Sequence, residues 1–366
     1  MPAAPVLRWE LFQDISTRST GGPEGGVLRY STDGEPGLAR IGKPGKFRYI
    51  GQDAKPVRGK STLARIDRLA IPPAWRDVWI ASDANAHLQA TGRDAKGRKQ
   101  YRYHPDFIAI RDEVKYTHVL EFAKGLPALR RRLKADLRLP GLPREKVLAA
   151  IVTLLEQTLV RIGSEDYARA NGSFGLTTLR NRHVRVRGQT LTFRFKGKSG
   201  RTWNLSFRDR RVAKIVLSCQ ELPGQHLFEY RGADGAVASV SSSDVNSYLR
   251  DTTGRDITAK DFRTWAGTVK AAVYFSQMER APSKASIREV VASVAAELGN
   301  TVAVCRRCYI HPDIITAYQA GHLNLRFPKK AAGGFFPEER SVLSFLLRCS
   351  KKSHQKARDG SGTQNS

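Results

Sequence analysis

Short stretches of alternating apolar and polar residues characterise the first hundred positions of the chain. Residues 79–81 and 87–91 have this pattern, and a Gly-containing turn at 94–97 leads into a further segment of the same kind over 98–103. Successive side chains of a strand point to opposite faces of a sheet, so this alternation indicates half-buried strands. The pattern predicts a small β-rich domain that contains a hairpin.

Helical periodicity follows in the next part of the chain. Apolar residues recur at steps of three and four over 147–159, which predicts a helix with one buried face and Arg161 at its end. A second helix is predicted over 286–298. Ser286 and Glu289 have the spacing of a capping box at its start, and Gly299 is suited to stop it.

Alternation returns between these two helices, at 184–187, 191–196 and 203–207. Gly188 and the Gly-rich residues 197–200 provide the intervening turns. These segments predict a three-stranded β-meander, with Lys198 exposed at the tip of its second hairpin.

Together these patterns predict an α+β fold, with a small β-rich N-terminal domain and a larger, mainly α-helical domain that contains an embedded β-meander. The start of the chain, which ends in a Gly/Pro-rich run, predicts a flexible arm over 1–26. The β-rich domain is assigned to 27–112 and the helical domain to 113–328. Residues 329–366 are basic and then Gly/Ser-rich, which predicts a partly disordered C-terminal tail.

The charge of the chain narrows the class of partner. Its 366 residues include 62 Lys and Arg against 34 Asp and Glu, a formal net charge of +28. Such an excess repels itself in the compact state and is best tolerated beside a polyanion. Nucleic acid is therefore the favoured partner, and an acidic membrane surface is the weaker candidate. No apolar run reaches the roughly 18 residues of a membrane span, and four cysteines fit a reducing cytoplasm better than a disulfide framework.

Several motifs for other chemistries are incomplete. Gly197-Lys198-Ser199 resembles the end of a nucleotide-binding P-loop, but Thr192 stands where that motif needs its first glycine. No tight carboxylate cluster of the kind that holds paired Mg²⁺ is apparent. Cys305 and Cys308, followed by His311, make half a zinc site without a second ligand pair. We therefore expect no bound nucleotide, no metal and no cofactor.

Phosphate chemistry without a metal needs cations and a nucleophile from the protein. Arginine offers a rigid fork of donors to phosphate oxygens, lysine can protonate a leaving alkoxide, and a tyrosine phenol can form a covalent phosphodiester. The chain carries these residue types in recognisable contexts. They are RIGSEDY at 161–167, GLTTL at 175–179, FKGKSG at 195–200, KDFRTW at 260–265, LGNT at 298–301 and YIHP at 309–312.

In this order, the six contexts resemble those of the type IB DNA topoisomerases, in particular the compact bacterial and poxvirus-like branch. The resemblance extends from about Ile71 to about Phe327 and includes IPPAW at 71–75 and GRKQYRY at 97–103. It implies an enzyme that cleaves one strand of duplex DNA through a 3′-phosphotyrosyl intermediate, relaxes supercoils and reseals the strand without ATP or metal.

The resemblance also implies the catalytic residues. Arg161, Lys198 and Arg263 match the family's catalytic cations, and Tyr309 matches its nucleophile. Tyr318 is the rival nucleophile, but the family's tyrosine is followed by two residues and then proline, which favours Tyr309. Asn300 precedes Tyr309 by nine residues, at a position that is often histidine in the wider family. Asparagine does not titrate near neutrality, so it can donate a hydrogen bond to phosphate but cannot transfer a proton.

Residues matched to DNA contacts lie mainly in the N-terminal hairpin. They are Arg98, Lys99, Gln100, Tyr101, Tyr103 and, in the larger domain, Tyr167. Ser164 stands where the poxvirus enzymes carry a basic base-reading residue, so their pyrimidine-rich cleavage preference is not expected here. The resemblance makes 27–112 a DNA-binding domain and 113–328 the catalytic domain. It implies a monomer whose two domains form a clamp around duplex DNA in the bacterial nucleoid.

Two other functions remain open at this point. A tyrosine recombinase uses the same arginine, lysine and tyrosine chemistry, but that group generally has histidine three positions before its second arginine, where this chain has Lys260. A basic DNA-binding protein without catalysis would use only the net charge, and would form no covalent adduct with DNA.

Overall fold

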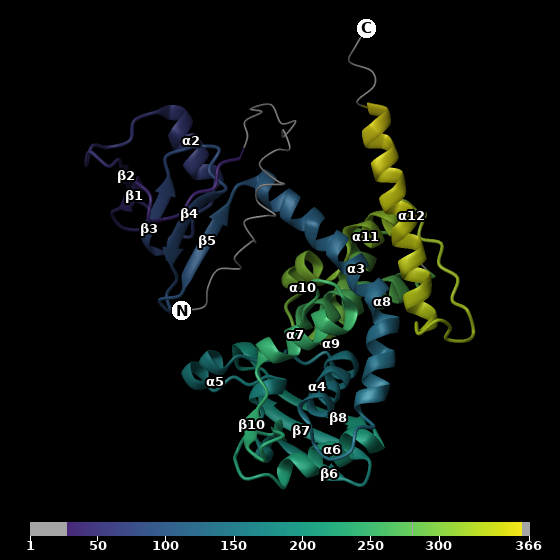
Figure 1. Ribbon diagram of the computed structural model, residues 1–366. Helices are drawn as coiled ribbons and strands as arrows, with labels where there is room; N and C mark the ends of the chain where they lie inside the picture. The colour runs from purple at the N-terminus through teal and green to yellow at the C-terminus, as the bar shows by residue number, and fades with distance from the viewer. Residues whose placement is uncertain (1–27, 280, 361–366) are drawn as a thin grey trace. The chain divides into compact units, whose positions relative to one another are not determined.

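The computed structural model describes residues 28–279 and 281–360. The chain divides into two units, Met1–Lys115 and Tyr116–Ser366, each with its own core (Figure 1). The arm predicted over 1–26 lies outside the described residues. Helix α3 (Pro105–Asp136) crosses the division. Within the described residues, none of the helices combines the length and the apolar character that crossing a bilayer requires.

The first unit is built on a five-stranded antiparallel sheet with the order β2-β1-β3-β4-β5. Its strands are β1 (Gly37–Ile41), β2 (Arg48–Ile50), β3 (Arg76–Ala81), β4 (Leu88–Arg93) and β5 (Lys99–Tyr103). Helix α2 (Lys60–Arg68) packs on this sheet through Ile66, which lies in one cluster with Val78, Ile80 and Ala90. The predicted hairpin is confirmed, since Asp94 N donates to Arg98 O at 2.9 Å and β4 pairs with β5.

The second unit is mainly helical. Its helices after α3 are α4 (Arg144–Thr158), α5 (Glu165–Asn171), α6 (Arg210–Gln220), α7 (Ser242–Thr253), α8 (Ala259–Ser276), α9 (Lys284–Leu298), α10 (Val302–Tyr309), α11 (Pro312–Gln319) and α12 (Pro337–Gly360). A two-stranded ribbon pairs β9 (Glu229–Arg231) with β10 (Val237–Ser239). Of the predicted α+β fold, the small N-terminal sheet and the larger helical core are therefore confirmed.

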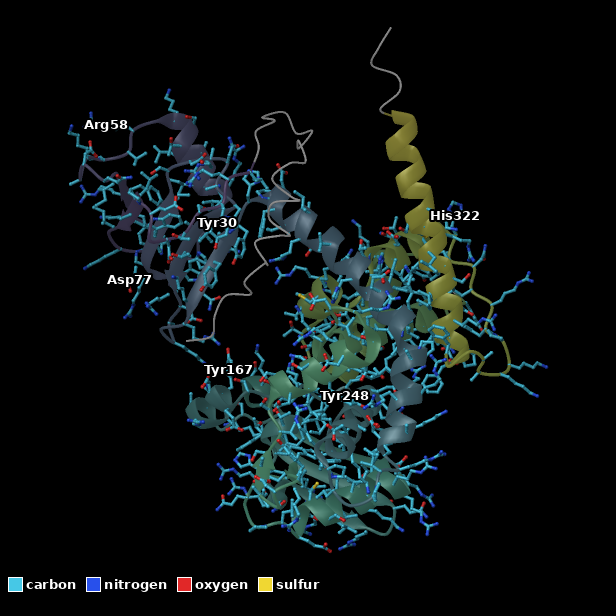
Figure 2. The ribbon with its side chains drawn as sticks, viewed as in Figure 1. Tyr30, Arg58, Asp77, Tyr167, Tyr248 and His322 are labelled. Carbon is cyan, nitrogen blue, oxygen red and sulfur yellow. The ribbon has the colours of Figure 1, made fainter. Side chains whose placement is uncertain are left out.

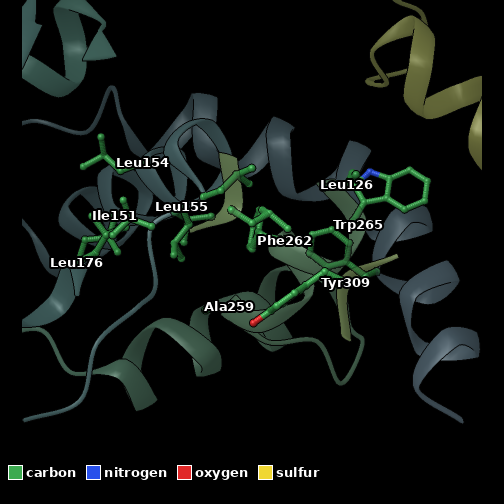
Figure 3. Packing of buried hydrophobic residues seen from close by; sticks show 14 of the residues in the cluster. Leu126, Ile151, Leu154, Leu155, Leu176, Ala259, Phe262, Trp265 and Tyr309 are labelled. Atoms are coloured by element: carbon green, nitrogen blue, oxygen red, sulfur yellow. The ribbon is translucent and has the colours of Figure 1, made fainter. Parts of the chain in front are cut away.

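Helix α4 lies at the centre of this core. Every residue from Val147 to Val152 is buried, as are Leu154 and Leu155, and several of these side chains appear in Figure 3. The periodicity predicted burial of one face only. The difference arises because α6, α7 and α8 all contact α4, and a helix that is apolar on all sides is buried on all sides.

The predicted meander is confirmed as β6 (Val184–Arg187), β7 (Thr190–Lys196) and β8 (Thr202–Arg208), in that order. Leu191, Phe193 and Phe195 of β7 are buried, whereas Arg194 and Lys196 between and after them are exposed. The turn between β7 and β8 contains Lys198–Gly200, so Lys198 lies at an exposed hairpin tip as predicted.

Helix α9 begins three residues earlier than the capping-box pattern indicated. Ser283 is the N-cap, and its hydroxyl accepts a hydrogen bond from Ser286 N, so the prediction of Ser286 as the cap was wrong. The predicted stop is confirmed, because Gly299 has the left-handed φ of 64° that ends the helix.

The segment assigned to a C-terminal tail contains a helix that the sequence pattern did not predict. Helix α12, yellow in Figure 1, buries Val342 and Leu346 in the core of the second unit. Glu339, in its first turn, accepts hydrogen bonds from the Arg130 guanidinium and, at 3.1 Å, from Trp265 Nε1 of α8. The helix is thereby joined to α3 and α8.

Candidate active site

Arg161 and Asn300 lie together although 139 positions separate them in the sequence of the second unit. Nη2 of Arg161 donates a hydrogen bond to Oδ1 of Asn300 at 2.6 Å. Arg161 follows the end of α4, where Leu159 has a left-handed φ of 55° that turns the chain out of the helix. Asn300 follows Gly299 at the end of α9. Each side chain therefore lies just beyond a helix whose end is sharply defined.

A second backbone segment holds the residues around Arg161. Leu176 N donates to Arg161 O at 2.9 Å, and Thr177 N donates to Ile162 O at 2.8 Å. The approach is close enough to require glycine, since a Cβ on Gly175 would lie 2.5 Å from Arg161 O. The GLTTL motif at 175–179 thus supports the backbone at Arg161.

Arg263 links the end of α4 to the end of α9. It lies on α8 with only 3% of its surface exposed. Its Nη1 donates to Leu159 O, two residues before Arg161, and its Nη2 donates to Leu298 O, two residues before Asn300. Burial is the main reason that the pKa of Arg263 lies below its ordinary value, with the nearby positive charge of Arg161 adding to the effect. A buried guanidinium therefore ties the ends of α4 and α9 together.

The Nε atom of Arg263 donates to neither carbonyl. Within the part of the chain that the structure describes, its buried Nε has no hydrogen-bond partner. A buried N–H without an acceptor is costly, so such a group marks a place where an acceptor from a ligand would be stabilised.

Tyr309 ends α10 beside this arginine. Its residue is 9% exposed, and the guanidinium carbon of Arg263 lies 5.1 Å from the centroid of its ring. Figure 3 shows Tyr309 among the buried side chains of the second unit, with Phe262 and Trp265 of α8 close by. Gly267 of α8 permits this packing, because a Cβ there would lie 2.5 Å from Tyr309 O.

Two hydroxyl groups hold the backbone around Tyr309. The hydroxyl of Tyr116 donates to Ile310 O at 3.0 Å, and Thr268 Oγ1 accepts from His311 N at 3.1 Å. Tyr116, Gly267 and Thr268 could not be predicted as residues of this site from the sequence. No local motif marks them, since the residues that they contact here are at least 42 positions away in the sequence.

The rival tyrosine has a different environment. Tyr318 is buried, its ring stacks on Phe275 at 4.3 Å between centroids, and its hydroxyl bonds Ser286 Oγ at 3.0 Å. Its hydroxyl is thus engaged within the core, on the side of α9 that faces α8 and α11.

Asn300 has a defined orientation. Arginine can only donate, so the atom facing Arg161 must be the amide oxygen. The amide nitrogen makes only a long contact, 3.4 Å, with Leu298 O. Nδ2 is therefore the part of Asn300 that remains able to donate to a ligand.

Lys198 is the one predicted catalytic residue outside this group. It is exposed at its hairpin tip, and its Nζ lies 5.7 Å from the centroid of the Tyr167 ring. Tyr167 belongs to α5 and is itself 40% exposed (Figure 2). The structure thus brings Arg161, Arg263, Asn300 and Tyr309 together, and joins Lys198 with the predicted DNA-contact residue Tyr167.

The other predicted DNA-contact residues share the hairpin of the first unit. Arg98 forms an ion pair with Asp94 at 2.6 Å, and Gln100 Nε2 donates to the same carboxylate at 3.0 Å. The bond from Arg98 lowers the pKa of Asp94. Lys99 pairs with Asp33 at 2.5 Å.

The aromatic residues of this hairpin lie together. Tyr101 stacks on Tyr103 at 6.0 Å between centroids, with Lys99 Nζ 5.9 Å from the Tyr101 ring. Neighbouring residues of a strand face opposite sides, so Tyr101 and Tyr103 share a face that Gln100 does not. The predicted contacts therefore divide between two faces of β5.

The residues of the incomplete zinc pattern have other contacts. Cys305 is buried, and burial raises the pKa of its thiol to about 11. His311 is the N-cap of α11, and its Nδ1 accepts from Asp313 N at 3.2 Å. Among residues 28–279 and 281–360, no group of three or more His, Cys, Asp and Glu side chains is arranged to hold a metal.

Comparisons with known proteins agree along most of the chain. Residues 104–326 match the family model of the eukaryotic DNA topoisomerase I catalytic core, and residues 46–94 match that of the bacterial DNA topoisomerase IB N-terminal domain. DNA topoisomerase 1B of Acanthamoeba polyphaga mimivirus is 32% identical over 298 residues, which cover 77% of this chain and 88% of that protein. DNA topoisomerase 1B of vaccinia virus (strain Copenhagen) is 24% identical over 141 residues, or 36% of this chain and 44% of the viral protein.

Proposed function

The chain belongs to the type IB DNA topoisomerase family, and we propose that Tyr309 is its nucleophile and that Arg161, Arg263 and Asn300 stabilise the transition state. The protein is a DNA topoisomerase I. The proposal rests above all on one observation, the convergence of these four side chains from four separate segments of the second unit.

The reaction is a transfer of a phosphodiester. The phenolic oxygen of Tyr309 attacks phosphorus in line, a P–O bond to tyrosine forms, and the P–O5′ bond breaks. The phenol gives up its proton to solvent, and the departing O5′ takes up a proton from a general acid to become a 5′-hydroxyl. The uncut strand holds the duplex together while the free end rotates. Resealing is the reverse step, and because the phosphotyrosyl bond keeps the energy of the original bond, we propose that neither ATP nor metal is required.

The donors that remain able to bind a ligand support the roles of the three stabilising residues. Arg263 Nε is buried and lacks an acceptor within the described structure, and Asn300 Nδ2 is only weakly engaged. Arg161 uses Nη2 on Asn300 and is half-buried, so its remaining N–H groups can reach a ligand. Charge on the non-bridging oxygens grows as the phenol attacks, and fixed donors aimed at that charge lower the barrier.

Lys198 is the proposed general acid. Its hairpin tip is exposed, and with no asparagine or arginine of the site able to release a proton near neutrality, the lysine is the group left to protonate O5′. Its neighbour Tyr167 is proposed to contact DNA beside the cleaved phosphate.

Duplex DNA is the proposed partner of both units. The net charge of +28 suits a polyanion, and the hairpin residues Arg98, Lys99, Gln100, Tyr101 and Tyr103 are proposed to contact DNA from the first unit. We propose that the protein closes around the duplex as a monomeric clamp and acts on the nucleoid of a bacterial cytoplasm. If the clamp neutralises about ten phosphates, log K should fall by about nine per decade of salt.

The function is tested by incubating supercoiled plasmid with the wild-type protein and with Tyr309→Phe, in EDTA and without nucleotide. The wild type should relax plasmids that share no particular site and should leave a covalent DNA adduct when detergent stops the reaction. Tyr309→Phe should do neither, while Tyr318→Phe should retain both activities. An adduct on Tyr309→Phe would disprove the assignment. Dependence of relaxation on one specific DNA site would favour a recombinase instead.

A further inference from the structure

The turn that carries Lys198 is a small closed unit. Gly197 N donates to Arg201 O at 2.7 Å, and Gly200 N donates to Gly197 O at 3.1 Å. Ser199 has a left-handed φ of 63°, which tightens the turn further. Lys198 must therefore move together with the two ends of its turn, and whatever holds those ends determines where its amine lies.

Arg201 attaches one end of this turn to α9. Its Nη2 donates to Ala296 O at 2.9 Å. Ala296 O lies in the last turn of α9, where it also accepts from Gly299 N at 3.2 Å. Carbonyl groups at the end of a helix carry partial negative charge, so a guanidinium is well suited to this place.

The contact depends on two glycines around one indole. A Cβ on Gly299 would lie 2.9 Å from Trp203 Cζ2 and 3.2 Å from Arg201 Cζ, and a Cβ on Gly197 would lie 2.7 Å from Trp203 Nε1. The Arg201 guanidinium lies 5.3 Å from the centroid of the Trp203 ring. The hairpin is thus packed directly on the residue that precedes Asn300.

We propose that Arg201 is a positioning residue, which holds the Lys198 turn against the end of α9 and so keeps the lysine beside the Asn300 end of the site. The proposal rests on the proposed role of Lys198 as general acid. Arg201 has no part in bond breaking. It acts through Lys198, because proton transfer to O5′ requires the amine to come within hydrogen-bond reach, and a displacement of about 1 Å in such a group can cost about 100-fold in rate.

A chemical substitution in the DNA separates this role from a general structural one. A substrate whose bridging 5′-oxygen is replaced by sulfur needs no proton on its leaving group. Single-turnover cleavage of the oxygen and sulfur substrates is measured for wild type, Lys198→Ala, Arg201→Ala and Arg201→Lys. Arg194→Ala is the matched control, since Arg194 is an exposed arginine of the same hairpin.

On the oxygen substrate, Arg201→Ala should cleave about 10- to 100-fold more slowly than wild type. On the sulfur substrate it should cleave at nearly the wild-type rate. Arg201→Lys, which retains a donor for Ala296 O, should recover part of the lost rate, and Arg194→Ala should cleave both substrates as wild type does. The double variant Lys198→Ala/Arg201→Ala should be no slower than Lys198→Ala alone, because the second change acts only through the lysine.

Equal slowing of Arg201→Ala on both substrates would overturn the proposal, as would a wild-type rate on the oxygen substrate or additive losses in the double variant. The proposed role of Lys198 has its own criterion. If sulfur fails to rescue Lys198→Ala, that role is wrong, whatever Arg201→Ala does. If sulfur rescues Lys198→Ala and not Arg201→Ala, only the positioning role is wrong.

Discussion

Arg161 donates a hydrogen bond from Nη2 to Oδ1 of Asn300 at 2.6 Å, although 139 positions separate the two residues in the chain. The bond orients the asparagine amide, because a guanidinium offers no acceptor for Nδ2. It also commits one donor of Arg161 to the protein. The two residues are consequently one unit. The groups that it can still offer to a ligand are the other N–H groups of Arg161 and the weakly engaged amide nitrogen of Asn300.

Asn300→Asp tests this arrangement. The carboxylate would form an ion pair with Arg161 and present negative charge to the phosphate. Asn300→Ala should lower the cleavage rate by about 100- to 1,000-fold, and Asn300→Asp should lower it at least as much. The measurement is single-turnover cleavage of a DNA duplex at saturating enzyme. Asn300→His, which keeps an N–H donor, is the control and should lose less. A smaller loss in Asn300→Asp than in Asn300→Ala would contradict the proposed donor role.

Substitution of Arg263 should lower the free energy of unfolding more than substitution of Arg161 does. Arg263→Lys removes donors from the buried carbonyls of Leu159 and Leu298, so it should lower the free energy of unfolding by about 2 kcal/mol or more and cleavage by at least 100-fold. Arg161→Ala should reduce cleavage similarly but change stability by less than about 1 kcal/mol, because Arg161 is only half-buried. Urea unfolding and cleavage rates measure both. Equal destabilisation would show that Arg263 does not join the two helix ends.

Gly175→Ala should disturb the site without touching any catalytic side chain. The added Cβ would lie 2.4 Å from Gly163 N and 2.5 Å from Arg161 O, so the segment that carries Arg161 must shift. Cleavage should fall by about 100-fold, the cost of a misplacement near 1 Å. Gly125→Ala, in α3, is the control. Its Cβ would meet nothing closer than 3.4 Å, and helix propensity predicts a gain of up to about 1 kcal/mol. Unchanged cleavage in Gly175→Ala would rule out the proposed support.

We expect the pairing of His118 with Asp261 to make the free energy of unfolding depend on pH. Its Nε2 lies 3.4 Å from Asp261 Oδ2, and the bond to Asp261 raises the pKa of His118 above its ordinary value of 6.5. A raised pKa in the folded state means that the protonated imidazole stabilises the protein. This contribution is fully present below about pH 6.5 and is lost as the pH rises through the folded-state pKa.

Urea unfolding of wild type and His118→Gln between pH 5.5 and 8.5 measures this contribution. The stability difference between the two proteins should be largest at the acid end, about 1 kcal/mol or less for a side chain that is 32% exposed, and should shrink toward alkaline pH. A difference independent of pH would mean that the His118–Asp261 pair does not form.

The local elements and the chemical types of the site residues could be predicted from the amino-acid sequence. Alternation predicted the meander and the hairpin, because a strand in contact with a core must bury every second side chain. Glycine at 299 predicted the end of α9, since few other residues adopt a left-handed φ without strain. The motif contexts around Arg161, Lys198, Arg263, Asn300 and Tyr309 indicated the family that the comparisons confirm.

How these residues are used depends on the packing of the folded chain. The spacing of residues in the sequence does not show which donors of a side chain remain able to bind a ligand. Arg263, for example, gives two of its N–H groups to carbonyls that are 104 and 35 positions away. Burial of α4 on all sides depends on three helices distant in sequence. Helix α12 in the basic tail likewise docks through Glu339 on residues far from it. A local sequence pattern indicates only the secondary structure that its own segment favours. Hydrogen-bond partners and burial depend on the packing of segments that are distant in the sequence.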